Sequence, residues 1–119
     1  MANEFKVKKG LIVTGGGTVV DIQGSQGQLL LGTGNDLEIY HTGSHSFIQD
    51  VGTGMLAIDT NGTDVRITKT DSEFMAKFVT DAEVQLYYNG SKKFETTNTG
   101  VTVTGKATIT NDLILAQIG

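Results

Sequence analysis

Cysteine, proline and tryptophan are all absent from this 119-residue chain. Without cysteine there can be no disulfide framework, thiolate metal site or cysteine nucleophile. No apolar run approaches the ~18 residues that a membrane-spanning helix requires, so we expect no membrane insertion. The nine lysines and arginines are scattered and the formal net charge is −4, which argues against a nucleic-acid partner. Disulfide-rich, membrane-spanning and nucleic-acid-binding classes are therefore set aside.

The residues that are abundant favour β-structure interrupted by many turns. Threonine and glycine number 17 and 16, and aspartate, asparagine and serine add 19 more. Threonine suits strands, whereas glycine, asparagine, aspartate and serine suit turns, and this mixture argues against long helices. Leucine, isoleucine, valine and phenylalanine together number 33, which is enough for a modest core.

Short segments in which apolar residues alternate with polar ones recur along the whole chain. A period of two predicts strands with one buried and one wet face. The predicted strands centre on Phe5/Val7, Leu11/Val13, Val20/Ile22, Leu29/Leu31, Leu37/Ile39, Leu56/Ile58, Val65/Ile67, Val84/Leu86, Val101/Val103, Ile109 and Leu113/Leu115, with less regular segments at Phe47/Ile48 and Met75–Val79. Their spacing of ~8–10 residues is typical of an antiparallel meander, sandwich or barrel.

Glycine-containing clusters separate the predicted strands. Asn61-Gly62 and Asn89-Gly90 each offer two adjacent residues that tolerate the positive φ angles of a two-residue hairpin. Residues 70–78 carry a weak helical signal, but a strand is the preferred interpretation. In that strand Met75 and Lys77 lie on one face, and Phe74 and Ala76 lie on the other.

The N-terminal residues 1–17 differ from the β-repeat body predicted for residues 18–119. Lys6, Lys8 and Lys9 lie in this segment and form the densest basic cluster of the chain. We interpret the segment either as an attachment site that faces an acidic patch on another protein, or as an edge strand protected by lysines. It has no apolar core of a secretory signal peptide, so we expect synthesis in the cytoplasm.

Two further features of the sequence are a weak internal repeat and a resemblance to a known family. Segments such as Asn35–Ile39, Thr63–Ile67 and Asn111–Leu115 share a polar pair followed by two aliphatic residues that flank a variable one. The stretch Asn35–Asp50, NDLEIYHTGSHSFIQD, resembles a segment repeated in tail-fibre and other virion proteins of marine bacteriophages, notably cyanophages.

The resemblance extends over other parts of the chain. Gly52–Asp59, Val84–Gly105, Phe5–Gly15 and Thr18–Gly24 also look like parts of such proteins. The resemblance implies a β-rich, homotrimeric, elongated virion component that is assembled in the host cytoplasm and attached to other virion proteins. We also expect such a component to project from the particle and to contact the host surface, with a surface glycan as a candidate partner.

The burial of the strands leads to the same fold by a physical argument. Strands of ~5 residues with one apolar face cannot all be covered inside a single chain of this size. Association into a closed ring would cover the faces and the strand edges together. We therefore expect an all-β fold of many short antiparallel strands, arranged as an elongated, intertwined β homotrimer. The alternative is a monomeric β-sandwich.

Catalytic and cofactor chemistry finds little support in the sequence. We expect neither an enzyme nor a cofactor, because no phosphate-binding loop and no nucleophile elbow is present. A triad can be written from Ser44 or Ser46, His45 and Asp50, but nothing orients it. Paired carboxylates for polysaccharide cleavage are conceivable, but the acidic residues are spread evenly along the chain and lie mostly beside turns.

Metal binding is also not expected. His41 and His45 are the only histidines and flank the turn Thr42-Gly43-Ser44. They are the candidate ligands if a transition metal binds, for example on a threefold axis. Asp59, Asn61 and Asp64 cluster as oxygen ligands for calcium, but the calcium-loop pattern is missing.

Four aromatic residues form a candidate contact surface, namely Tyr40, Tyr87, Tyr88 and Phe94. They could stack on a sugar or contact a partner, and the alternative is packing across strands or between subunits. Taken together, we expect a non-enzymatic structural virion protein that forms a short trimeric fibre or fibre segment. A capsid decoration or cement protein and a carbohydrate-binding β module are the alternatives.

Overall fold

The computed structural model describes residues 6–10, 14–15, 22 and 27–116, and all of the regular structure in them is β-strand. The chain divides into two compact units, residues 1–56 and 57–119, and each unit contains one antiparallel sheet. The sequence patterns had not indicated a division at this point. The prediction of an all-β antiparallel fold is confirmed. No helix able to cross a membrane is found in the part of the chain that the structure describes.

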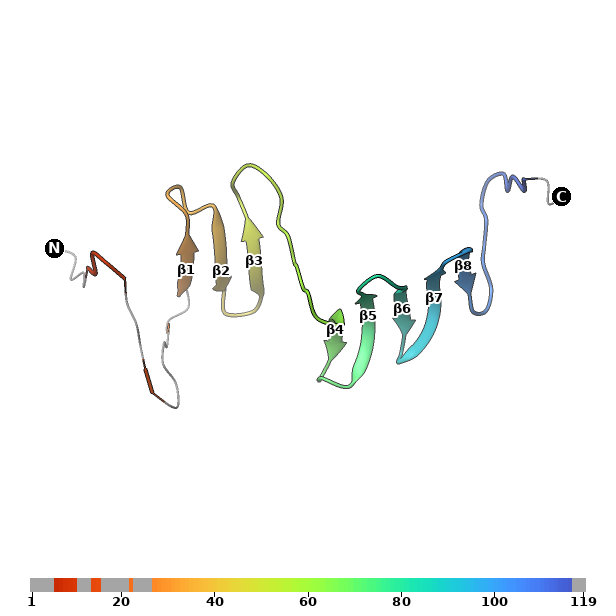
Figure 1. The fold of residues 1–119 in the computed structure, drawn as a ribbon, viewed down its shortest axis with the longest axis horizontal. Helices are drawn as coiled ribbons and strands as arrows, with labels where there is room; N and C mark the ends of the chain where they lie inside the picture. Colours follow the sequence, from red (N-terminus) through yellow and green to blue (C-terminus); the bar gives the residue numbers. More distant parts are fainter. Residues whose placement is uncertain (1–5, 11–13, 16–21, 23–26, 117–119) are drawn as a thin grey trace. The chain divides into compact units, whose positions relative to one another are not determined.

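The first unit contains a three-stranded meander, drawn in orange to yellow in Figure 1. Its strands are β1 (Gln28–Leu31), β2 (Leu37–His41) and β3 (Ser46–Asp50). Leu29 pairs with Ile39, which pairs with Ile48, so these three aliphatic side chains share one face of the sheet. Tyr40 pairs with Phe47 on the opposite face, where their rings stack with centroids 4.9 Å apart. Both faces of this small sheet therefore carry apolar side chains.

The second unit contains a five-stranded meander in which each strand pairs with the next (Figure 1). Its strands are β4 (Asp64–Lys69), β5 (Glu73–Val79), β6 (Val84–Tyr88), β7 (Ser91–Thr97) and β8 (Gly100–Val103). Asn89 and Gly90, with φ of 48° and 72°, form the two-residue turn between β6 and β7, as their sequence predicts. Asn61-Gly62 does not form the predicted hairpin, because it lies in the loop that leads into β4.

Two β-bulges in this sheet change which side chains share a face. The register shifts at Met75, so that Phe74 pairs with Thr68 while Ala76 pairs with Ile67. The bulge turns Phe74 to the side of the sheet that also carries Lys77. The prediction that Phe74 and Ala76 share a face is therefore wrong, because a simple period of two does not allow for an extra residue. A second bulge at Lys93 has the same effect on the following residues of β7.

Several predicted strands are not found. Residues 55–60 and 105–116 contain no strand, so the strands predicted at Leu56/Ile58, Ile109 and Leu113/Leu115 are wrong. Alternation alone does not make a strand, since the backbone also needs a partner to form hydrogen bonds. Val7 also lies outside any strand. The strands predicted around Leu11/Val13 and Val20, as well as Phe5 and the boundary at residue 17, lie outside the described residues.

Each sheet is a single layer, and among the described residues of its own unit no second layer covers it (Figure 1). Among the described residues Ala76, at 8% exposed, is the only buried hydrophobic residue. Large apolar side chains on both sheets, Ile48 and Leu86 among them, are 40% exposed or more. A hydrophobic core of the usual kind is therefore missing from the described part of the single chain.

Candidate functional site

The register of the β4–β8 sheet sorts its side chains into two faces of different chemistry. One face, the polar face, carries Asp64, Arg66, Thr68, Phe74, Lys77, Gln85, Tyr87, Lys92, Glu95 and Thr102. The other face, the apolar face, carries Val65, Ile67, Ala76, Phe78, Val84, Leu86, Tyr88, Ser91, Phe94, Thr96, Val101 and Val103, and at one end of β4 and β5 it also carries Lys69 and Glu73. The two faces are the best candidates for functional surfaces in the second unit.

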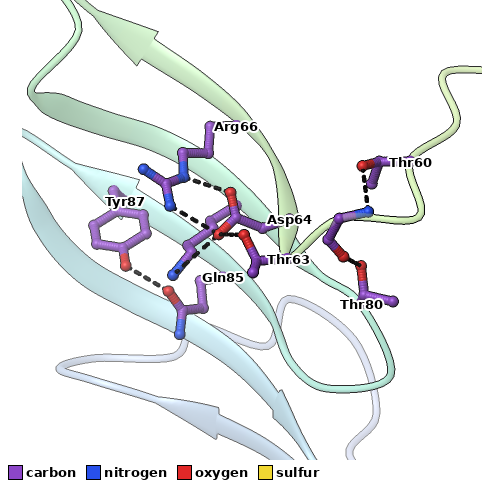
Figure 2. A network of polar contacts seen from close by, with 9 residues as sticks. Thr60, Thr63, Asp64, Arg66, Thr80, Gln85 and Tyr87 are labelled. Atoms are coloured by element: carbon purple, nitrogen blue, oxygen red, sulfur yellow. Dashed lines mark hydrogen bonds and ion pairs between the residues drawn. The ribbon is translucent and has the colours of Figure 1, made fainter.

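Asp64 is the centre of an ionic network on the polar face (Figure 2). Arg66 donates from Nε and Nη2 to the two carboxylate oxygens, the second bond at 2.9 Å, and Lys77 Nζ lies 3.8 Å away. The Asp64 side chain is only 7% exposed. The hydrogen bond from Arg66 lowers the pKa of Asp64 below its usual value, and the charges of Arg66 and Lys77 act in the same direction. The carboxylate is therefore ionised and fully partnered at neutral pH.

One aromatic ring, Phe74, covers both cations of this network, and a second ring, Tyr87, packs against it. The Arg66 guanidinium and the Lys77 ammonium lie 5.6 Å and 5.9 Å from the ring centroid of Phe74, which is within cation–π range. The Phe74 and Tyr87 rings meet at a centroid distance of 5.5 Å. The Tyr87 hydroxyl donates to Gln85 Oε1 at 2.5 Å, and Gln85 donates in turn to Glu83. The polar face is thus a closed network whose groups satisfy one another.

An ion pair between Lys92 and Glu95 extends the polar face toward β8. The hydrogen bond to Glu95 raises the pKa of Lys92, against the opposing effect of desolvation. Glu95 also lines an open hollow together with Asp81 and Glu83. Within the described residues, however, no three His, Asp or Glu side chains come close enough to hold a metal ion.

The apolar face differs from the polar face because none of the described residues of its own unit covers it. Its members lie on all five strands, and Ile67, Phe78, Leu86, Val101 and Val103 are between 43% and 61% exposed. An ion pair between Lys69 and Glu73 lies at one end of β4 and β5. The register places this pair on the apolar face, where its two charges neutralise each other, and the remaining paired residues of the face are uncharged.

The two histidines lie on the hairpin between β2 and β3, as predicted, but they do not face each other. His41 pairs with Ser46 across the hairpin, and its Nδ1 lies 3.0 Å from Ser46 Oγ. The Nδ1 atom of His45 lies 2.7 Å from Ser44 Oγ. Each imidazole therefore has a separate serine partner, and no shared metal position lies between them.

The other predicted constellations are not assembled either. Asp50 lies at the far end of β3 from Ser46 and accepts a hydrogen bond from the Gly52 N–H, so no Ser–His–Asp triad forms. Both oxygens of Asp64 are occupied by Arg66, which removes Asp64 from the predicted calcium ligand set of Asp59, Asn61 and Asp64.

The four predicted aromatic residues lie on three different surfaces. Tyr40 belongs to the sheet of the first unit, where it stacks on Phe47 and donates to Gln49. Tyr87 lies on the polar face, whereas Phe94, the cross-strand partner of Leu86, lies on the apolar face. Tyr88 is 75% exposed at the end of β6. Sequence reasoning missed the Phe74–Tyr87 pair, because only the bulge at Met75 brings Phe74 to this face.

Lys6, Lys8 and Lys9 are exposed and lie outside any strand. Their predicted role in attachment to a larger particle therefore does not depend on strand pairing by these three residues, and it stays a prediction.

A glycine-lined position in the first unit was also not predicted. The Asp36 side chain lies so close to Gly32, Gly34 and Gly52 that an added Cβ would come within 2.4 Å, 3.1 Å and 2.9 Å of it. The Asp36 carbonyl accepts a hydrogen bond of 2.8 Å from the Val51 N–H, so the residue also joins the β1–β2 turn to the end of β3. The sequence Gly-Thr-Gly occurs at 32–34 and again at 52–54, and this repeat could have indicated that these glycines lie close together.

Comparison with protein-family models, with curated proteins and with solved structures found no match.

Proposed function

We propose that this chain is a non-enzymatic structural protein of a bacteriophage virion, a short trimeric fibre or fibre segment that projects from the particle and contacts the host surface. The observation that carries the proposal is the uncovered apolar face of the β4–β8 sheet, with Ala76 as the only buried hydrophobic residue among those described. A chain whose sheets are one layer thick needs other chains to bury its apolar side chains. The resemblance of Asn35–Asp50 to repeats of phage fibres supplies the class of assembly.

A trimer agrees with the way in which the polar groups are arranged. The ionic network of Asp64, Arg66 and Lys77 is complete within one chain and needs no partner. The apolar face is incomplete without one. A closed ring of three copies gives every copy the same contacts and leaves no copy with an uncovered face.

Two measurements test this proposal. Light scattering on the purified protein should give about three times the 12.6 kDa chain mass, and the complex should persist on dilution because its interfaces resemble a core. Gold-labelled antibody on purified particles should mark the tail apparatus. Label on the capsid shell would instead favour a decoration or cement protein. A protein absent from particles would favour the carbohydrate-binding module.

Attachment to the particle through Lys6, Lys8 and Lys9 is part of the same proposal. The three lysines are exposed, and a rim of positive charge suits an acidic patch on a neighbouring virion protein. Replacing all three by alanine should leave the oligomer mass unchanged, weaken incorporation into particles at low salt and reduce its dependence on salt concentration. Normal incorporation of the variant at every salt concentration would place the attachment elsewhere.

A further inference from the structure

We infer that copies of this chain associate through the apolar face of the β4–β8 sheet, with the polar face turned outward. The inference rests on the proposed function, because it names the surface that assembles the proposed trimer. It is drawn from the contrast between the two faces of one sheet.

Burial of the polar face against a partner would disrupt its network of ion pairs and hydrogen bonds. Asp64 is already paired with Arg66 and Lys77, and Phe74 already covers both cations. A partner on this side would have to desolvate ion pairs that gain nothing from it. The apolar face has the opposite character, since away from the Lys69–Glu73 ion pair at one end its burial removes mainly hydrocarbon from water.

A second copy is the partner whose chemistry fits this face. Unbalanced charges on a contact surface are repelled when symmetry brings a copy of the surface close to itself. The paired residues of the apolar face carry no unbalanced charge, because Lys69 and Glu73 form an ion pair at one end of it. The carboxylates Asp64 and Glu95 lie on the opposite face. The net charge of −4 can therefore remain in solvent when copies meet through the apolar face.

Single introduced thiols test the assignment, because the chain contains no cysteine of its own. Val101 and Thr102 are neighbours on β8 that point to opposite faces. In the assembled protein a maleimide should label Val101→Cys at least tenfold more slowly than Thr102→Cys. Ile67→Cys, on β4 at the other edge of the sheet, should be protected as Val101→Cys is. Circular dichroism should show the same β-content for all three variants.

The outcomes separate the inference from the proposed function. If light scattering gives a trimer but Val101→Cys and Thr102→Cys react equally fast, the face is wrong and the trimer stands. If the protein is a monomer and Val101→Cys is still protected, the chain covers its own face as in a β-sandwich, and both fail. A monomer with two equally reactive thiols also overturns both.

A charged pair of variants provides a second test that does not depend on labelling. Val101 is 61% exposed in the single chain, so Val101→Lys removes little packing within that chain. It should reduce the mass in solution from that of three chains to that of one, whereas Thr102→Lys should leave it unchanged. A trimer that tolerates Val101→Lys as well as Thr102→Lys would contradict the inference.

Discussion

At the scale of single residues, Asp36 shows how glycines make room for a polar side chain. Gly32 and Gly43 both have φ of 93°, a conformation that residues with a Cβ rarely adopt. They differ in their surroundings, because a Cβ on Gly43 meets nothing within 4 Å whereas one on Gly32 meets the Asp36 carboxylate. A substitution at Gly43 therefore tests backbone strain alone, whereas a substitution at Gly32 tests backbone strain together with steric conflict.

We predict that Gly43→Ala lowers the free energy of opening of the β1–β3 sheet by about 1–2 kcal/mol, the usual penalty for a left-handed backbone. Gly32→Ala should lower it further, because Asp36 must move. Hydrogen exchange of the β2 amides measures both effects. Adding Asp36→Ala should relieve part of the Gly32→Ala effect and none of the Gly43→Ala effect. Equal losses in the two glycine variants would contradict the prediction.

Asp64 makes stability depend on pH in a predictable direction. Its folded-state pKa lies below the usual 3.8, chiefly because of the hydrogen bond from Arg66. The carboxylate therefore contributes stability that is fully present above pH 3.8 and is lost as the pH falls through the folded-state pKa. The Tm of Asp64→Asn should lie below that of the wild type at neutral pH, and the gap should close in acid.

Thermal unfolding followed by circular dichroism between about pH 7 and pH 2 measures this gap. Arg66→Gln is the companion variant, because it removes the main cause of the lowered pKa and leaves the carboxylate in place. It should weaken the pH dependence as well. A gap between wild type and Asp64→Asn that stays constant throughout the acid range would show that the ion pair does not stabilise the fold.

At the scale of elements, the alternation of apolar and polar residues predicted strands correctly where a neighbouring turn residue fixes the pairing of the strand. The strands around Leu37/Ile39, Val65/Ile67 and Val84/Leu86 were all predicted, and glycine lies in the turn before or after each of them. The strand β7 (Ser91–Thr97) was missed because its SKKFETT sequence has one apolar residue. The Asn89-Gly90 turn, rather than an alternating pattern of apolar residues, fixes the pairing of this strand with β6.

The candidate site was less predictable than the fold. The apolar face follows from a period of two along β4 and β6, so Val65, Ile67, Val84 and Leu86 could be placed from sequence. The polar network could not, because it depends on the bulge at Met75, and bulges have no reliable signal in a single sequence. Pairings between distant residues such as Phe74 and Tyr87 follow only from the register.

We expect the Asn89-Gly90 turn to stabilise the β6–β7 hairpin through its backbone conformation rather than through side-chain contacts. Both residues have positive φ, and a Cβ on Gly90 meets only Glu73 at an ordinary 3.6 Å. Gly90→Ala should therefore cost about 1–2 kcal/mol through backbone strain alone. Hydrogen exchange should show faster opening of the β6 and β7 amides than of the β4–β5 hairpin. Unchanged exchange in β7 would contradict this role.

At the scale of the whole molecule, the proposed association through the exposed apolar face would make stability a property of the assembly. A chain that buries its apolar side chains only against other copies gains its folding free energy partly from association. Its Tm then depends on protein concentration, which the Tm of a self-contained β-sandwich does not. Concentration dependence is therefore a thermodynamic counterpart to the mass in solution.

We predict that the Tm of the wild type rises over a hundredfold increase in protein concentration, because mass action favours the folded oligomer. Thr102→Lys should keep this dependence, since Thr102 lies on the polar face. Val101→Lys should lower the Tm and remove the dependence, because a lysine on the apolar face places charges opposite one another when copies meet. Scanning calorimetry at several concentrations measures all three proteins. A wild-type Tm that is independent of concentration, equal to that of Val101→Lys, would mean that the sheet is stable without a partner and that the apolar face has another purpose.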